Sequence, residues 1–168
     1  MVNIDDILDV FNRHQVEYLV IGGMNFLLRH QGRMTYDMDL WINDTDENRQ
    51  RCESALAELN AEWGAGDSDW GLVANKPAGW LERQGMFCMN SAAGAIDIFR
   101  TVDGLSDWNE SYRNSVSEQT SQGRKYQGIS DADMLKCQYA IDPTVRKSDR
   151  VSVLEQKLQT GPEEHGQQ

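Results

Sequence analysis

Two aspartates, Asp37 and Asp39, alternate inside the segment TYDMDLWI, which otherwise has the composition of a half-buried β-strand. Residues two apart in a strand point to the same face, so the two carboxylates would lie side by side while Met38 and Leu40 face the core. Like charges at that spacing repel each other, and aspartate is a poor strand residue. A hard divalent cation, Mg²⁺ or Mn²⁺, would compensate both charges. The pair therefore predicts a metal site.

A third aspartate, Asp97, lies in the segment AIDIF, where Ile96 and Ile98 face the opposite side of the expected strand. Three carboxylates held on strands can bind two metal ions, one that organises a triphosphate and one that lowers the pKa of an attacking hydroxyl. We therefore predict that Asp37, Asp39 and Asp97 are both metal ligands and catalytic residues.

Two adjacent glycines, Gly22 and Gly23, follow the apolar run VEYLVI, at the junction of an expected strand and an expected helix. Backbone amides at such a junction, with no Cβ in the way, can bind phosphate oxygens. A glycine pair alone most often marks a turn, and an alternating acidic pair alone is more often surface decoration or a helix cap. The order of glycine pair, acidic pair and lone strand aspartate is more specific, and it predicts a nucleotide site.

The elements that position these residues follow from hydrophobic periodicity. Helices are expected over residues 3–14, 24–30, 44–62, 108–116, 130–141 and 144–158, the fifth with Ser130 as its N-cap. Strands are expected over residues 16–21, 34–42, 86–90 and 95–99, with a weak strand within 123–130. Residues 63–84, rich in glycine and tryptophan, are expected to be irregular with one short helix near Ala78–Arg83. This order indicates an α+β domain.

Length and composition set further limits. The 168 residues fit one domain over residues 1–158, helical from about residue 130, with a flexible tail over 159–168. The net charge of −11 argues against loose binding to DNA or to a membrane surface. Three widely spaced cysteines, the lack of a signal-peptide pattern and the lack of a long apolar run lead us to expect a cytoplasmic protein.

The stretch IGGMNFLLRHQGRMTYDMDLWI resembles the DNA polymerase β-type nucleotidyltransferase superfamily. It is similar to a subgroup of small bacterial proteins with a glycine pair followed by Arg-x-Thr-x-Asp-x-Asp, which includes relatives of abortive-infection and toxin–antitoxin nucleotidyltransferases. The aminoglycoside and lincosamide nucleotidyltransferases are more distant relatives. The resemblance covers most of the chain, and it implies a polymerase β-like mixed sheet flanked by helices, with a helical C-terminal segment.

The resemblance also implies roles for residues beyond the three aspartates. Gly22 and Gly23 match the phosphate-binding glycines of the family. Arg33 and Thr35 match the pair before the acidic motif, where an arginine can contact triphosphate oxygens. Lys136 matches a basic position in the C-terminal helix, either as a phosphate contact or as the partner of a nearby aspartate. All five residues are thus candidates for binding the nucleotide.

The sequence departs from the family pattern at three positions. Residue 24 is methionine where larger members often have serine, so the phosphate cradle lacks a hydroxyl. In the C-terminal pattern Arg146 and Asp149 are present, but Ser148 and Ser152 occupy the positions of a lysine and a second aspartate. Because the metal-binding carboxylates are intact, these departures affect the contacts with nucleotide or acceptor and not the metal site.

The predicted activity is the metal-dependent transfer of a nucleoside monophosphate from an NTP to an acceptor hydroxyl, with release of pyrophosphate. A tRNA end or a protein side chain, as in a toxin–antitoxin system with a cognate antitoxin as partner, is the first acceptor considered. An aminoglycoside- or lincosamide-like small molecule is the second. An RNA acceptor requires that six basic residues converge on one face: Arg113, Arg124, Lys125, Arg146, Lys147 and Arg150.

Two other classes of function remain open from the sequence. One is a non-catalytic module that binds a nucleotide or a partner protein, motivated by Met24 and the short chain. The other treats DMD as the metal motif of a glycosyltransferase, which the upstream glycine pair opposes. Nucleotide binding without transfer would indicate the first class, and UDP-sugar binding would indicate the second.

Overall fold

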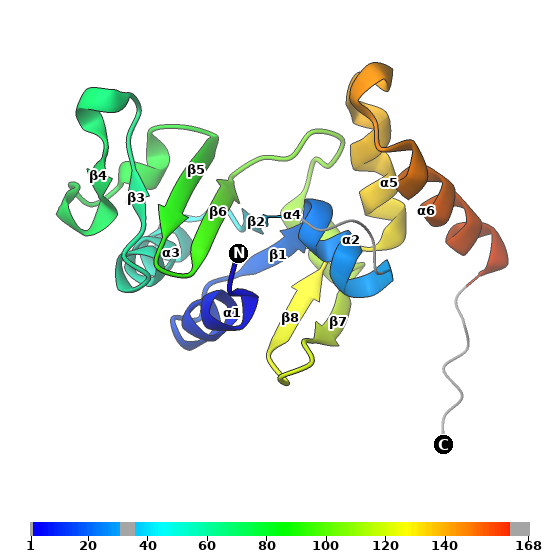
Figure 1. Cartoon of the computed structure of the whole chain (residues 1–168), viewed down its shortest axis with the longest axis horizontal. Helices are drawn as coiled ribbons and strands as arrows, with labels where there is room; N and C mark the ends of the chain where they lie inside the picture. The colour runs from blue at the N-terminus through cyan, green and yellow to red at the C-terminus, as the bar shows by residue number, and fades with distance from the viewer. Residues whose placement is uncertain (1, 31–35, 162–168) are drawn as a thin grey trace.

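An eight-stranded mixed sheet organises the computed structural model, which describes residues 2–30 and 36–161 (Figure 1). The strand order is β4-β3-β5-β6-β2-β1-β8-β7. The strands are β1 (Tyr18–Ile21), β2 (Asp37–Ile42), β3 (Glu62–Trp63), β4 (Gly71–Leu72), β5 (Met86–Ser91), β6 (Gly94–Phe99), β7 (Val116–Gln119) and β8 (Lys125–Gly128). The helices are α1 (Ile4–Arg13), α2 (Gly22–His30), α3 (Asp46–Glu58), α4 (Trp108–Arg113), α5 (Asp131–Ala140) and α6 (Ser148–Thr160).

The pairing of β1, β2 and β6 lies at the centre of the sheet. Strand β2 runs antiparallel to β1 and parallel to β6, and β6 runs antiparallel to β5 through a tight turn. Strand β8 is parallel to β1 and forms a hairpin with β7 at one edge, while β3 and β4 form the other edge. The predicted α+β class with a mixed sheet flanked by helices is confirmed.

Alternating side chains of the central strands pack into two separate cores. One core joins α1 and α3 to the sheet face that carries Met38, Leu40 and Ile98, all fully buried. The second core joins α4, α5 and α6 to the opposite face, through residues such as Leu19 and Trp41. Figure 1 shows α5 and α6 beside α2 and away from β3, β4 and β5. The second face is therefore covered only over part of its width.

Most predicted helices and strands are present with shifts of a few residues at their ends. The predicted N-cap of α5 is confirmed, because the Ser130 hydroxyl accepts a hydrogen bond from the Asp133 amide at 3.1 Å. Helix α2 begins at Gly22, so the glycine pair forms the first turn and does not precede it. Helix α6 continues to Thr160, beyond the start that we expected for the tail.

Three strands were not predicted. Strands β3 and β4 are two residues long, too short for a hydrophobic pattern to be recognised. Strand β4 and Trp63 lie in the segment expected to be irregular, whereas Glu62 was expected to end the helix that the structure ends at Glu58. Strand β7 is a polar edge strand with the sequence VSEQ, and it lacks the apolar alternation of a half-buried strand. Long-range pairing, and not local pattern, determines these elements. None of the helices described has the length and apolar character needed to cross a membrane.

Candidate active site

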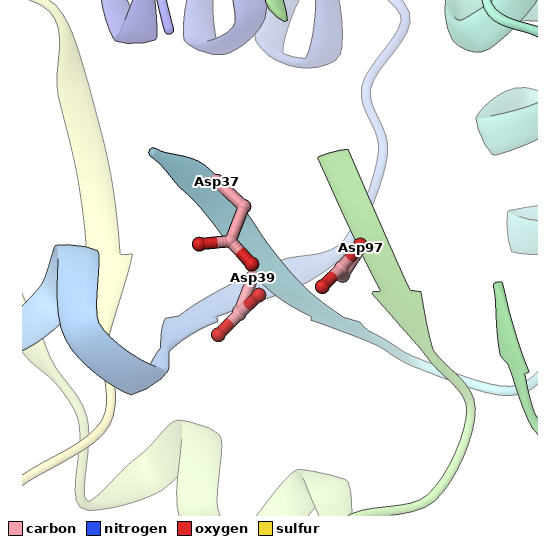
Figure 2. Close-up of side chains that lie close together, drawn as sticks. All are labelled: Asp37, Asp39 and Asp97. Carbon is pink, nitrogen blue, oxygen red and sulfur yellow. The ribbon is translucent and has the colours of Figure 1, made fainter. Parts of the chain in front are cut away.

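The three predicted aspartates converge on one face of the sheet. Asp37 and Asp39 lie on β2, and Asp97 lies on β6 directly opposite Asp39 in the parallel pairing. A carboxylate oxygen of each residue lies within 4.8 Å of one from each of the other two. Figure 2 shows the three side chains projecting from the two neighbouring strands toward a common point. All three are partly buried, as expected for residues at the edge of a helix-covered face.

Burial and mutual repulsion make the charged form of this cluster costly. Burial, together with the neighbouring Asp37 and Asp97 carboxylates, raises the pKa of Asp39 to about 8. Burial and the Asp37 carboxylate also raise the pKa of Asp97. Without a bound cation, at least one of these carboxylates is therefore protonated near neutral pH.

The donor set fits a hard divalent cation. The Oδ1 atom of Asp39 is buried and makes no hydrogen bond to any residue described, although buried carboxylate oxygens are almost always paired. Three carboxylates within 4.8 Å of one another supply the oxygen ligands that Mg²⁺ and Mn²⁺ prefer. A bound cation would both provide a partner for the unpaired Asp39 oxygen and lower the raised pKa values of Asp39 and Asp97.

Gly22 is the closest neighbour of the carboxylates on the helix side. Its φ is +66°, and a Cβ at this position would lie 2.2 Å from Oδ2 of Asp39. Both the backbone conformation and the contact therefore favour glycine, since any side chain here would be strained and would displace the Asp39 carboxylate. The first turn of α2, with Gly22 and Gly23, thus places its free backbone amides beside the acidic cluster, as a phosphate cradle requires.

Helix α2 is held in this position by polar contacts with the segment that enters α5. Arg29 donates to the carbonyl of Ile129 at 2.9 Å and forms an ion pair with Asp131 at 3.1 Å. The His30 ring also contacts Asp131, at 2.8 Å. Asn25 is fully buried and donates to the same Ile129 carbonyl at 3.1 Å. These contacts connect the glycine turn to the C-terminal helices.

A basic residue that we had assigned only to an RNA surface, Arg150 of α6, is directed toward the acidic cluster. Its guanidinium lies 5.5 Å from the centre of the Phe26 ring, and its charge lowers the pKa of Asp39 against the larger effects of burial and the other carboxylates. Arg150 and Gly22 both line a cavity of about 30 Å³ between α2, α5 and α6. No local sequence signal distinguishes Arg150 from the other C-terminal cations.

The other residues that the sequence analysis linked to the nucleotide are not observed beside the acidic cluster. The Lys136 ammonium is largely exposed and lies 3.5 Å from Asp133, which corresponds to the ion-pair alternative considered above. Arg33 and Thr35 lie outside the described residues. Met24 is buried in the core formed with α1 and α3, so its side chain is directed away from the site.

Sequence reasoning also missed Cys88 of β5, which pairs with Asp97 across the antiparallel strands. Its thiol is exposed, and partial burial and the Asp97 carboxylate raise the pKa of the thiol. Cys88 therefore borders the acidic cluster on the side opposite to Gly22.

A larger cavity lies elsewhere in the molecule. It has a volume of about 980 Å³ and is lined by residues of α4 and of the β7–β8 hairpin and by the start of β1, including Trp108, Tyr112 and Glu17. None of the three aspartates lines it. Because a cavity without the acidic cluster offers no means of activating a phosphate, we locate the candidate active site at the aspartates and not in the larger cavity.

No protein-family model matches the sequence, and no curated protein matches it at a significant level. Solved structures do match in fold. The structure of ANT(2″)-Ia in complex with adenylyl-2″-tobramycin superposes with a TM-score of 0.57 at 14% identity, over 94% of this chain and 89% of that chain. The lincosamide antibiotic adenylyltransferase LnuA, bound to lincomycin, gives 0.54 at 18% identity, over 92% and 97%. A Thermotoga maritima protein described as a candidate nucleotidyltransferase gives 0.52 at 14% identity, over 94% and 91%.

These structures share the fold of nearly the whole chain. The predicted nucleotidyltransferase fold is therefore confirmed, including its helical C-terminal segment.

Proposed function

We propose that the chain is a metal-dependent nucleotidyltransferase that moves a nucleoside monophosphate from an NTP to a hydroxyl group of a small-molecule acceptor. The observation that carries this proposal is the convergence of Asp37, Asp39 and Asp97 within 4.8 Å, next to Gly22, where a Cβ would meet the Asp39 carboxylate at 2.2 Å. A carboxylate cluster beside a helix N-terminus is an arrangement suited to a metal–triphosphate complex.

The chemistry follows from the position of each group. The acceptor oxygen forms a bond to the α-phosphorus, the bond from that phosphorus to the bridging oxygen breaks, and pyrophosphate leaves. A bound divalent cation would be held by the three aspartates and would supply charge neutralisation for the phosphates. Asp97, which lies on β6 across from Asp39, would accept the hydroxyl proton as the general base. The amides of Gly22 and Gly23 bind phosphate oxygens, and Arg150 adds positive charge on the helix side.

The distribution of basic residues supports a small-molecule acceptor over RNA. Arg124 lies near Asp9, with 3.8 Å between the charged groups, beside the β7–β8 hairpin. Arg146 donates to the carbonyls of Gln138 and Ile141 at the end of α5. Figure 1 shows the hairpin and the α5–α6 connection on opposite sides of α2. Because these cations do not form one surface, neither an RNA acceptor nor a cognate antitoxin is part of the proposal.

The first test is thermal unfolding with each of ATP, GTP, CTP and UTP, with and without Mg²⁺. ATP is the donor to try first, because one structure of the same fold contains an adenylyl product and another is an adenylyltransferase. A ligand at 100 times its dissociation constant stabilises the native state by about 2.7 kcal/mol. We expect a Mg²⁺-dependent rise in melting temperature that is lost in Asp37→Asn and kept in the exposed control Asp67→Asn.

A second measurement separates catalysis from binding. Asp39→Asn should abolish pyrophosphate release while leaving the circular dichroism spectrum near native. Retained turnover in Asp39→Asn would contradict the proposal. Nucleotide binding without transfer to any hydroxyl acceptor would instead favour the non-catalytic nucleotide-binding module.

A further inference from the structure

The part of the aspartate-bearing sheet face that β3, β4 and β5 form has no helix packed on it among the residues described. Strand β5 alternates between buried Phe87 and Met89, which face α1 and α3, and exposed Met86, Cys88 and Asn90 on the other face. Helices α4, α5 and α6 pack with residues of β1 and β2. The surface formed by β5, β3 and β4 therefore continues outward from the acidic cluster as an accessible platform.

The strand register extends this platform in a straight row. Asp37 pairs with Ala95, Ala95 with Asn90, Asn90 with Glu62, and Glu62 with Leu72. Paired residues of neighbouring strands share a face, so all five side-chain positions lie on the side of the aspartates. With strands about 4.8 Å apart, Glu62 lies roughly 14 Å from Asp37 along the row.

Near the far end of the row, the Glu62 carboxylate accepts a hydrogen bond from the indole ring of Trp70. The indole N–H of Trp70 donates to Oε2 of Glu62 at 3.4 Å, and among the described residues this is its one hydrogen-bond partner. Trp70 is 46% exposed and Leu72 39%, although both are large apolar side chains. A carboxylate beside an open aromatic face is suited to an ammonium group carried on a sugar-like ring.

Charge on the platform favours a cationic ligand. Two cations that follow this segment in the chain, Lys76 and Arg83, lie 5.3 and 5.0 Å from the centre of the Trp63 ring. Trp63 alternates with Glu62 in β3 and packs into the core with Phe87, so these cations belong to the opposite side. The platform thus ends in acidic groups at both ends, and phosphate groups of an acceptor would be repelled.

The order of the strands also separates the two substrates. Gly22 and Arg150 border the cluster on the β1 and α6 side, where the phosphates of the donor would bind. Asp97 faces Cys88 of β5 on the other side, and it is the carboxylate nearest to the platform. A hydroxyl that reaches Asp97 from the platform would approach from the side opposite to the phosphate cradle, as in-line displacement requires.

We propose that the acceptor lies across this platform and is an amine-bearing polyhydroxyl compound, whose reacting hydroxyl contacts Asp97 and whose ammonium group pairs with Glu62. The inference rests on the proposed function, and it names the acceptor class and the specificity-determining pair Glu62 and Trp70.

The test uses two probes that differ in charge and share their ring hydroxyls, tobramycin and fully N-acetylated tobramycin. Binding to the full chain is measured by calorimetry in the presence of Mg²⁺ at about 0.15 M ionic strength, so that long-range attraction to the acidic protein is screened. Because the pairing is charge-assisted, we expect tobramycin to bind at least about tenfold more tightly than its acetylated form.

Variants locate the interaction. Glu62→Gln should remove most of the preference for the amine-bearing probe, and Trp70→Ala should weaken both probes by a similar factor. The matched control Glu118→Gln removes the same charge on β7, at the other edge of the sheet, and should change neither affinity. No binding of tobramycin, equal binding of the two probes, or an unchanged preference in Glu62→Gln would overturn the inference.

Failure of the acceptor-site inference can be distinguished from failure of the proposed function by measuring nucleotide binding in the same proteins. Stabilisation by ATP and Mg²⁺ should be the same in Glu62→Gln as in the wild type, since the platform does not include the phosphate cradle. Loss of the preference with nucleotide binding retained supports the acceptor site. Absence of nucleotide binding in the wild type would contradict the proposed function itself.

Discussion

At the scale of single residues, the candidate site contains two carboxylates, Asp39 and Asp97, whose pKa values are raised. The pKa of Asp39 is raised to about 8 by burial and by the adjacent carboxylates, and its buried Oδ1 has no partner among the residues described. Such a group lowers the stability of the metal-free protein and increases its affinity for a cation. The burial and charge repulsion that destabilise the metal-free fold would therefore favour binding of a cation at the candidate site.

The sign of the pH dependence follows from this pKa. Between the unfolded value of about 3.9 and the folded value of about 8, the native protein binds more protons at Asp39 than the unfolded chain does. The contribution of Asp39 to the free energy of unfolding therefore falls as pH rises through that window. We expect metal-free Asp39→Asn to be more stable than the wild type by about 0.5–2 kcal/mol at pH 8, with a smaller difference at pH 5.

The measurement is thermal unfolding in EDTA at both pH values, with Asp67→Asn as the control for a surface charge. Mg²⁺ should stabilise the wild type and not Asp39→Asn. An advantage of the variant that is independent of pH would show that the charge of Asp39 is not the cause.

Gly22 provides a second prediction at this scale. Gly22→Ala introduces a Cβ that would meet Asp39 at 2.2 Å, in a backbone with a φ of +66°. Gly123 has a φ of +82°, and a Cβ there would meet no other part of the described chain within 4 Å, so Gly123→Ala carries the backbone strain alone. We expect both variants to lose about 1 kcal/mol of stability, and only Gly22→Ala to lose nucleotide binding and transfer.

These effects are compared by nucleotide titration and by pyrophosphate release at a temperature where both variants are folded. Equal loss of activity in the two glycine variants would attribute the effect to general strain and not to the contact with Asp39.

Arg150 provides the third prediction. Its charge opposes the rise in the pKa of Asp39 that burial and the other carboxylates cause, and Arg150 lines the same cavity as Gly22. Arg150→Gln should weaken nucleotide binding by about tenfold, as the loss of one charge-assisted contact implies. Arg113→Gln on α4 is the matched control, and similar affinities of the two variants would assign Arg150 a structural role.

At the scale of elements, the critical connection is the docking of α2 onto the start of α5. Arg29 and His30, at the C-terminal end of α2, both contact Asp131, and all three side chains are largely buried. The glycine turn lies at the other end of the same short helix. A change in the packing of this end would therefore move the glycine turn, the proposed phosphate site, relative to the aspartates on β2 and β6.

Asp131→Asn tests this connection. Removal of the charge leaves the Arg29 guanidinium and the His30 ring facing a weaker partner, so we expect a loss of roughly 1–3 kcal/mol, or several degrees in melting temperature. Asp46→Asn removes an exposed carboxylate whose partner, Arg49, keeps its ion pairs with Asp44 and Glu82, so it should cost less than about 0.5 kcal/mol. Nucleotide affinity should fall in Asp131→Asn and remain unchanged in Asp46→Asn, as measured by titration at a temperature where both are folded.

At the scale of the whole molecule, the distribution of charge determines which acceptors can approach. The chain has a net charge of −11, the acidic cluster is at the centre of the sheet, and Glu62 is near one edge. Basic side chains are dispersed over the hairpin, α4 and the C-terminal helices, where several of them cap helices or form ion pairs. A polyanionic acceptor would meet repulsion along the whole open face.

We therefore expect tRNA neither to bind at about 0.15 M ionic strength nor to be modified by the protein with Mg²⁺ and any NTP. Gel-shift titration and transfer of labelled nucleotide to tRNA test this expectation, with a cationic polyhydroxyl compound as the positive comparison. Labelled tRNA would restore the RNA acceptor and would require a basic surface formed in the bound state.

Local sequence determined which residues form the candidate site and which elements carry them. The alternation of Asp37 and Asp39 with buried Met38 and Leu40, the lone Asp97 and the Ser130 cap all rest on spacing within a few residues, and the structure has each of them as expected. Such features follow from the strand period of two and from capping by one side chain, which a single sequence displays directly.

Only the tertiary structure determined which side chains meet. The parallel pairing of Asp39 with Asp97, the approach of Gly22 to Asp39 and the direction of Arg150 all join segments far apart in the chain. The row that ends at Glu62 depends on two-residue strands without a recognisable pattern. Strand order and register arise from packing of the whole sheet, so no local periodicity encodes them, and the acceptor platform appears only when the fold is complete.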